Sequence, residues 1–186
     1  NAPLAVVGRD IHYSYRYEMS RQEGPHSRIC LTTETSAFEH LRVPLHGEHQ
    51  AQNCALALAL LDKLKGRGFT VNDEEALQGL CSLDLPGRTE LICSEPRVLI
   101  DGAQNAASIS ALIRAIALYV PADSVVMIFG CTHDKDIEGM LHELQYGADK
   151  VIFTSGNSRR AASPNDLANR YSEICGKMCQ VTDNLE

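Results

Sequence analysis

Apolar and polar positions alternate in the first part of the chain, which is the pattern of strands buried on one face. Three tyrosines alternate with polar residues over 13–17, and the range 41–45 alternates again. A turn over residues 22–25 and a return strand over 27–33 lie between these two segments. The first 46 residues are therefore predicted to form β structure.

The apolar period then changes to that of helices. Residues 48–65 are rich in Ala and Leu and carry two lysines in the last turn, where cations complement the helix dipole. Gly66 follows and is predicted to end this helix as a left-handed cap. A second helix is predicted from Asn72, which has Glu75 at capping-box spacing, to about residue 81.

From residue 85 onwards, strand-like and helix-like segments alternate. This alternation predicts right-handed βαβ units, and therefore an α/β chain with a mainly parallel sheet covered by helices. Residues 85–87 (Leu-Pro-Gly) form the natural boundary before it. The predicted strands are 98–101, 125–129 and 151–154, and the helices are 108–119, 137–145 and one that opens with Ser163 as N-cap and Pro164 at its first position.

Polar loops follow each of these three strands. Ligands bind at the carboxyl ends of parallel strands, so the loops 101–105, 130–136 and 155–160 are expected to face one crevice. Asp101, Lys135 and Arg160 would there form a site for a small, polar, anionic molecule. Taken singly, each has an alternative explanation as a helix cap, an exposed ion pair or a solvated turn.

Composition narrows the classes of partner. The formal net charge is −7, from 17 basic and 24 acidic residues, which disfavours non-specific nucleic-acid binding. Seven scattered cysteines without a CxxC pair disfavour a disulfide scaffold or a zinc site, and we expect reduced thiols in a cytoplasmic protein. The longest apolar stretch, 54–61, is too short to cross a membrane. His46 and His49 have no obvious third ligand, so no metal site is predicted.

Several motifs occur in order along nearly the whole chain and together resemble the folylpolyglutamate and dihydrofolate synthases of the Mur ligase superfamily. The segment 47–55 (GEHQAQNCA) is similar to their GxHQxxNxxxA signature, and Gln50 favours the folate branch. The remaining matches are 8–10 (GRD), 85–90 (LPGRTE, similar to PGRxE), 101–105 (DGAQN, similar to DGAHN), 129–136 (similar to FGxxxDKD) and 160–161 (RA).

The resemblance implies the C-terminal portion of an ATP-dependent ligase that adds glutamate to folates through an acyl phosphate. Residues 1–84 would be the tail of the ATP-binding domain, and 85–186 the Rossmann-like, glutamate-binding C-terminal domain. ATP and Mg²⁺ would be required, with folate and L-glutamate as substrates and neither nucleic acid nor membrane as partner. The full-length protein would be monomeric, whereas the fragment would self-associate through its uncovered apolar faces.

The resemblance also implies roles for single residues. Asn53, Arg88 and Asp101 would bind the nucleotide at its base, phosphates and ribose side. Ser158 and Arg160 would bind the incoming glutamate. The catalytic candidates are Lys135 and Gln104.

One departure from the motifs leaves other functions open. Gln104 replaces the motif's histidine. Unlike histidine, a glutamine side chain cannot take up a proton and so cannot become positively charged. A non-catalytic small-molecule-binding module on the same fold is therefore an alternative, as is a Mur-type ligase for another acidic substrate. The sequence contains no GxxxxGK[ST] phosphate loop, so the fragment alone is expected to be inactive in ATP hydrolysis.

Overall fold

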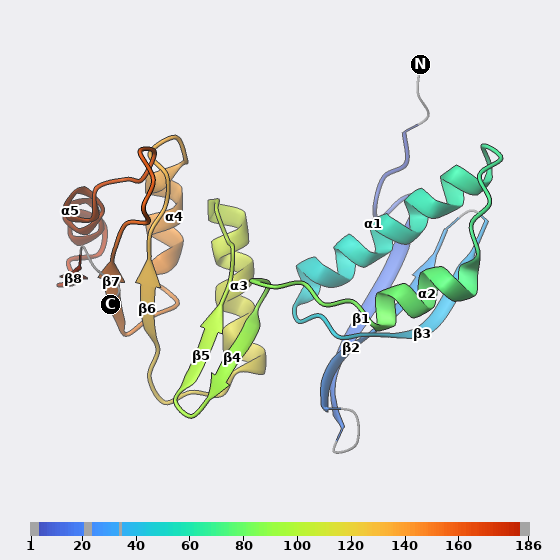
Figure 1. Ribbon diagram of the computed structural model, residues 1–186, viewed down its shortest axis with the longest axis horizontal. Helices are drawn as coiled ribbons and strands as arrows, with labels where there is room; N and C mark the ends of the chain where they lie inside the picture. The colour runs from blue at the N-terminus through green and yellow to red at the C-terminus, as the bar shows by residue number, and fades with distance from the viewer. Residues whose placement is uncertain (1–3, 21–23, 34, 183–186) are drawn as a thin grey trace. The chain divides into compact units, whose positions relative to one another are not determined.

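Strand pairing in the amino-terminal part follows the alternation of the sequence. The strands β1 (His12–Ser20), β2 (Gly24–Thr32) and β3 (Ala37–Val43) form an antiparallel sheet in the order β1-β2-β3 (Figure 1). The computed structural model describes residues 4–20, 24–33 and 35–182, so residues 22 and 23 of the predicted turn lie outside the described part.

Two helices pack on one face of this sheet. The helix α1 (Glu48–Lys65) has the predicted bounds, and α2 (Asp73–Cys81) is capped by Asn72, whose side chain accepts hydrogen bonds from two backbone amides. Ile29 and Leu31 of β2 and Leu58 of α1 are almost completely buried at the interface.

The predicted left-handed cap at Gly66 is wrong. Gly66 has a right-handed φ of −60°, and its amide still bonds to Asp62 of the last helical turn. The chain turns by two further residues before it reverses, so the positive φ of 87° falls at Gly68.

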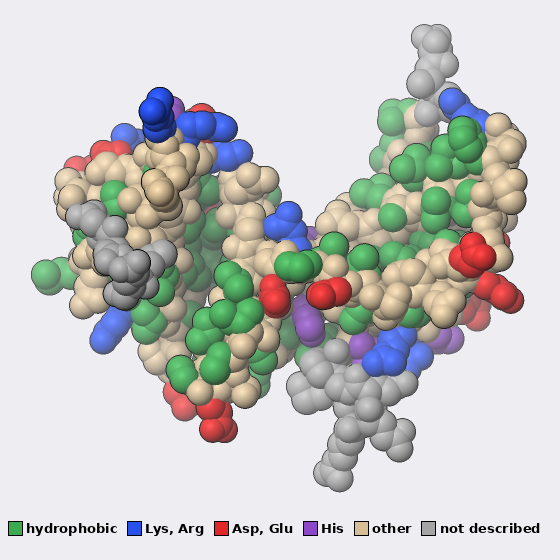
Figure 2. Space-filling model, viewed as in Figure 1, with side chains coloured by type: hydrophobic (Ala, Val, Ile, Leu, Met, Phe, Trp, Pro, Cys, Tyr) green, Lys and Arg blue, Asp and Glu red, His purple; other side chains and the backbone are tan. Residues whose placement is uncertain are grey.

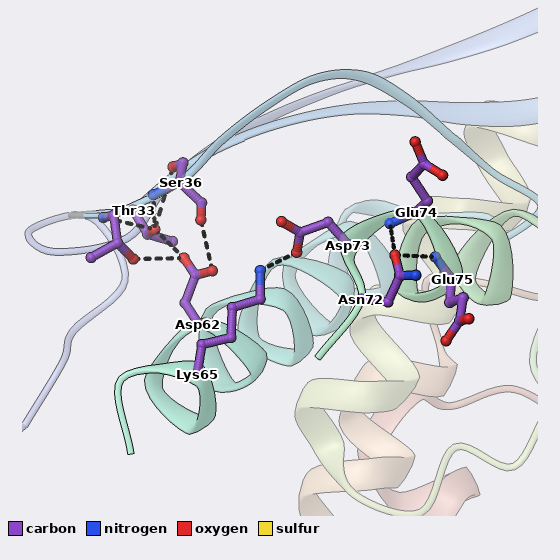
Figure 3. Close-up of polar contacts among 9 residues, drawn as sticks. Thr33, Ser36, Asp62, Lys65, Asn72, Asp73, Glu74 and Glu75 are labelled. Atoms are coloured by element: carbon purple, nitrogen blue, oxygen red, sulfur yellow. Dashed lines mark hydrogen bonds and ion pairs between the residues drawn. The ribbon is translucent and has the colours of Figure 1, made fainter. Parts of the chain in front are cut away.

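A buried carboxylate ties α1 to the loop between β2 and β3 (Figure 3). The side chain of Asp62 accepts hydrogen bonds from the hydroxyls of Thr33 (2.5 Å), Ser36 (2.7 Å) and Thr35 (3.2 Å). Burial alone would raise the pKa of Asp62, but the three hydroxyl donors outweigh it and the pKa is lowered. Asp62 therefore holds the loop against the helix as an anion.

Apolar side chains of α1 also remain on its surface. Leu56 is 42% exposed and Leu60 is 61% exposed, one turn apart on the helix. The expected self-association through such faces stays a prediction.

The strand predicted at 98–101 forms, but its partner differs from the prediction. The strand β5 (Arg97–Ile100) pairs antiparallel with β4 (Glu90–Ser94), and neither belongs to the parallel sheet. Residues 95 and 96 join the two strands in a tight hairpin, so a local partner takes the hydrogen bonds that a parallel neighbour would need.

The carboxyl-terminal part contains the predicted parallel sheet. The strands β6 (Val126–Phe129) and β7 (Lys150–Phe153) pair in parallel, and a short strand β8 (Gln180–Val181), which the sequence did not predict, extends the sheet. The α/β class is confirmed.

Three helices accompany this sheet: α3 (Ala106–Tyr119), α4 (Ile137–Leu144) and α5 (Pro164–Cys175). Their core centres on Leu144, Phe153, Leu167 and Tyr171, all at most 1% exposed. Ser163 and Pro164 begin α5 as predicted. The Ser163 side chain forms no capping hydrogen bond within the described part of the chain.

The spacing of Cys175 and Cys179 predicts that they lie on one face of a helix, and this prediction is wrong. Gly176 adopts a left-handed φ of 67° and ends α5 directly after Cys175. Both cysteines nevertheless pack against the core of this part.

The contacts divide the chain into two compact units, Asn1–Ile100 and Asp101–Glu186. The β4–β5 hairpin lies with the first unit. The predicted domain boundary after residue 84 concerns the parent protein and stays a prediction.

Candidate functional site

The loops that follow β6 and β7 are joined to each other by backbone hydrogen bonds. The His133 amide donates to the Arg160 carbonyl (2.8 Å), the Ala162 amide donates to the Cys131 carbonyl (2.9 Å), and Thr132 forms an antiparallel bridge with Ala161. Two of the three loops chosen from the sequence therefore form one rigid edge.

Gly130 permits this close approach. A Cβ atom at Gly130 would lie 2.6 Å from the carbonyl oxygen of Thr154, which is backbone and cannot move aside. The residue that follows β6 must therefore be glycine for the two loops to meet in this way.

Side chains continue the junction on the surface. The Arg160 guanidinium donates to the Asp134 carboxylate at 2.7 Å, and the His133 ring places Nδ1 2.9 Å from the Arg160 carbonyl. The Thr132 hydroxyl, with help from Arg160, lowers the pKa of Asp134 to about 2, so this carboxylate is ionised at neutral pH. Arg160 is 64% exposed and Asp134 42% exposed, so their pairing orients the guanidinium more than it stabilises the fold.

A cavity of about 430 Å³ opens beside this junction, between the starts of α4 and α5. Its size falls within the range of small-molecule sites. Charged groups of both signs line it, namely the cations Lys135 and Arg170 and the carboxylates of Asp136, Glu138 and Asp166, and the His133 ring lies among them.

Most of these side chains already have partners, whereas Lys135 and Glu138 have none in the described part of the chain. Asp136 accepts a hydrogen bond from the Gly139 amide as N-cap of α4, and Asp166 pairs with Arg170 at 3.1 Å. Within 4–20, 24–33 and 35–182, the half-buried Lys135 has neither an ion-pair nor a hydrogen-bond partner for its ammonium group. Lys135 is thus the charge best placed to meet an anionic ligand group.

The third predicted loop carries Asp101 and Gln104 but does not follow a strand of the parallel sheet. Asp101 accepts a hydrogen bond from the Ala103 amide (2.7 Å), and the backbone amide of Gln104 donates to the Ser108 hydroxyl (3.0 Å). The expectation that three strand ends of one sheet face one crevice is therefore wrong for this loop, because β5 pairs with β4 instead. Asn105, rather than Asp101, caps α3, in a capping box with Ser108.

The remaining predicted residues are distributed over both units. Ser158 lies in the loop after β7, where its hydroxyl accepts from the Arg160 amide (3.2 Å). Asn53 is exposed on α1 and donates to Gln50 (3.4 Å), and Arg88 is exposed in the turn before β4. The structure brings Ser158, Arg160 and the Lys135 loop together; Asn53 and Arg88 belong to the first unit.

Sequence reasoning assigned no role to several residues of the site. His133 and Asp134 were inside the motif segment but carried no assigned role, and Arg170 lies one helical turn after Asp166. Only the last pair had a sequence signal, the i, i+4 spacing of opposite charges on a helix.

The described residues offer neither a metal site nor a membrane-spanning helix. In 4–20, 24–33 and 35–182, no group of three or more His, Cys, Asp or Glu side chains could hold a metal ion. None of the helices in this part is long and apolar enough to cross a membrane.

Residues 87–186 match a family described as Mur ligase, glutamate ligase domain. The chain belongs to this family of Mur ligases. This match confirms the resemblance that the motifs indicated. The candidate site lies inside the matched range.

Relatives of this Mur ligase chain carry folate-related names. A dihydrofolate synthase/folylpolyglutamate synthase of Mycobacterium tuberculosis is 35% identical over 75% of this chain and 29% of its own length. One of Bacillus subtilis is 31% identical over 81% of this chain and 35% of its own length.

A solved structure extends the likeness to both units. Folylpolyglutamate synthase of M. tuberculosis in complex with ADP has a TM-score of 0.83 and 29% identity, over 96% of this chain and 39% of that one. The chain thus spans about a third of the length of these relatives.

Proposed function

We propose that this chain is the carboxyl-terminal portion of an ATP-dependent ligase that joins glutamate to a folate. In this reaction a carboxylate oxygen of the folate accepts the terminal phosphoryl group of ATP, which releases ADP. The amine nitrogen of glutamate then attacks the acyl phosphate, phosphate leaves, and the new amide nitrogen loses a proton.

One observation carries the proposal: the likeness to folylpolyglutamate synthases runs through both units and is not confined to the matched family domain. The relative crystallised with ADP aligns over 96% of the chain. A binding module that shared only the Rossmann-like domain would not be expected to retain the helix α1 and the motif at 47–55.

The second unit supports a role in holding the amino acid. Glutamate carries one ammonium and two carboxylates, and the cavity beside Lys135 offers groups of both signs. We assign Lys135, Ser158 and Arg160 to the glutamate, with Lys135 and Gln104 as the catalytic candidates. Asn53, Arg88 and Asp101 are assigned to the nucleotide.

ATP and Mg²⁺ belong to the proposal for the whole protein. Successive backbone amides and a lysine normally wrap the β- and γ-phosphates, and this sequence has no such loop. The described residues also lack a cluster of metal ligands, so they do not by themselves fit a magnesium site. What this chain contributes is the orientation and charge compensation of the attacking amino acid.

Incorporation of labelled glutamate into folate by the full-length parent protein tests the proposal. We expect incorporation that requires both ATP and a folate. Incorporation into a nucleotide-linked muramyl substrate instead would move the protein to another branch of the Mur ligases. Binding of glutamate without any incorporation would favour the non-catalytic binding module that Gln104 leaves open.

A further inference from the structure

The cavity beside the loops after β6 and β7 has two charged lining residues that no group of the described chain neutralises. Among the other charged residues of its lining, Arg170 pairs with Asp166 at 3.1 Å, and Asp136 is occupied as the N-cap of α4. Lys135 and Glu138 have no partner in the part of the chain that the structure describes, and they do not pair with each other. One free positive and one free negative charge therefore line the same cavity.

The start of α4 places both of these side chains. Lys135 directly precedes the N-cap residue Asp136, and Glu138 lies in the first turn of the helix. Lys135 is half-buried and Glu138 is exposed, so both remain accessible to a ligand. Figure 2 shows basic (blue), acidic (red) and histidine (purple) side chains gathered over the end of the second unit where the loops after β6 and β7 lie.

Helix stabilisation explains only one of the two charges. An acidic side chain in the first turn of a helix interacts favourably with the helix dipole, which accounts for the acid at Glu138. The same dipole disfavours the positive charge of Lys135, which lies at the same end of α4. A half-buried ammonium group also loses part of its hydration, and no carboxylate of the described chain compensates for this loss. A carboxylate of a ligand would do so.

The two free charges match a zwitterion better than an anion. A purely anionic ligand would be attracted by Lys135 and repelled by Glu138 and Asp136. An α-amino acid carries an ammonium group and a carboxylate on one carbon atom, with the nitrogen about 2.5 Å from the carboxyl carbon by standard bond lengths. Such a ligand can pair with Lys135 and Glu138 at once, although these two do not pair with each other.

We propose that Glu138 binds the α-ammonium group of the incoming glutamate while Lys135 binds its α-carboxylate, so that the cavity selects an α-amino acid over a simple dicarboxylate. The inference rests on the proposed function, in which glutamate supplies the attacking amine. Hydrogen bonds between charged partners are shorter and stronger than those between neutral ones, so Glu138 fixes the position of the nitrogen that later attacks the acyl phosphate. Glu138 is thereby a specificity-determining residue to which the sequence motifs assign no role.

Calorimetric titration of the 186-residue chain with glutamate and with glutarate tests this assignment. Glutarate has the carbon chain and both carboxylates of glutamate but no ammonium group. We expect the wild type to prefer glutamate about fivefold, as one exposed charge pair would provide, and Glu138→Gln to lose this preference. Glu173→Gln is the matched control, because it removes the same charge from an exposed residue in the last turn of α5, away from the cavity. Circular dichroism of both variants verifies that they remain folded.

The kinetics of the full-length parent protein provide a second readout. Glu138→Gln should raise the glutamate concentration needed for half-maximal incorporation about fivefold and leave the maximal rate nearly unchanged. This division is expected because Glu138 holds the amino acid equally before and during the reaction, and the loss of such uniform binding weakens substrate binding without slowing the chemical step.

Several results would overturn the inference. Equal affinity of the wild type for glutamate and glutarate would remove its basis, as would a preference that Glu138→Gln retains or that Glu173→Gln also loses. Absence of binding to either ligand would do the same, because every lining residue of the cavity belongs to this chain.

The inference and the proposed function fail in different ways. A full-length protein that adds glutamate to folate, with the same glutamate dependence in Glu138→Gln as in the wild type, would overturn the inference and leave the proposed function intact. A full-length protein that makes no glutamylated folate, while glutamate binding still depends on Glu138, would refute the proposed function and retain the α-amino-acid site.

Discussion

Replacement of Asp62 by asparagine isolates the contribution of a single buried carboxylate to the first unit. Asp62 is 7% exposed and accepts three hydroxyl hydrogen bonds, two on Oδ2 and one on Oδ1. Asparagine has the same size but only one acceptor oxygen, so at least one hydroxyl loses its acceptor and the others lose a charged partner.

The magnitude follows from those bonds. A hydrogen bond to a charged group contributes about 1.5–3 kcal/mol and one between neutral groups about 1 kcal/mol. Because Thr33, Thr35 and Ser36 are not fully buried, the freed hydroxyl can reach water, which favours the lower end. We therefore expect Asp62→Asn to lower the free energy of unfolding by about 2–3 kcal/mol at pH 7. The urea midpoint of the first unit would fall by about 1 M or more.

The pH dependence gives the sharper test. The pKa of Asp62 is lower in the folded state than in the unfolded state. Its stabilising effect is thus complete above the unfolded pKa of about 3.9 and is lost as the pH falls through the folded pKa. The difference between wild type and Asp62→Asn should accordingly narrow below pH 4.

Urea unfolding followed by far-UV circular dichroism, at pH 7 and in steps below pH 4, measures both effects. Asp166→Asn is the matched control, because Asp166 is an exposed acid whose pairing with Arg170 is worth less than about 0.5 kcal/mol. Equal losses for the two variants at pH 7 would refute the reasoning. So would a penalty for Asp62→Asn that is undiminished at acid pH.

Three other changes have defined outcomes. Gly130→Ala places a Cβ 2.6 Å from the Thr154 carbonyl, so we expect a loss of about 1–3 kcal/mol in thermal unfolding, and an unchanged melting curve would refute the close approach of the two loops. Asp134→Asn should leave the melting temperature almost unchanged, since its ion pair is exposed; a large loss in the same melt would contradict this. In the full-length protein, Lys135→Gln should raise the glutamate concentration needed for half-maximal incorporation, whereas Lys150→Gln, at the far end of β7, should not.

Much of the fold could be predicted because the local patterns and the final contacts agree. The helix α1 was predicted with both ends correct, since its apolar period, its terminal lysines and the sheet it covers all point to the same residues. The strand with which a given strand pairs is harder to predict from the sequence. The apolar pattern of residues 98–101 predicts a strand whether the partner is parallel or antiparallel. Only the hairpin with β4 makes the pairing antiparallel.

The candidate site likewise contains features that the sequence predicts and features that depend on contacts between distant residues. The rule for parallel strands correctly joined the loops after β6 and β7, because both strands lie in one sheet. The pairing of Arg160 with Asp134 was not predictable, because Lys135 and Asp134 are neighbours in sequence and a local ion pair was the simpler reading. The alignment of residues 16, 28 and 42 across the first sheet was equally unpredictable, because it depends on the strand register.

Binding of glutamate to this chain tests the central claim most directly, namely that the second unit carries the amino-acid site of a ligase. Calorimetry should detect weak glutamate binding that Arg160→Ala abolishes and Asn53→Ala retains, because Arg160 is assigned to the amino acid and Asn53 to the nucleotide. Arg159→Ala removes the same charge from the neighbouring exposed residue and should also retain binding. Glutamate binding that survives Arg160→Ala, or that is lost equally in Arg159→Ala, would contradict the account.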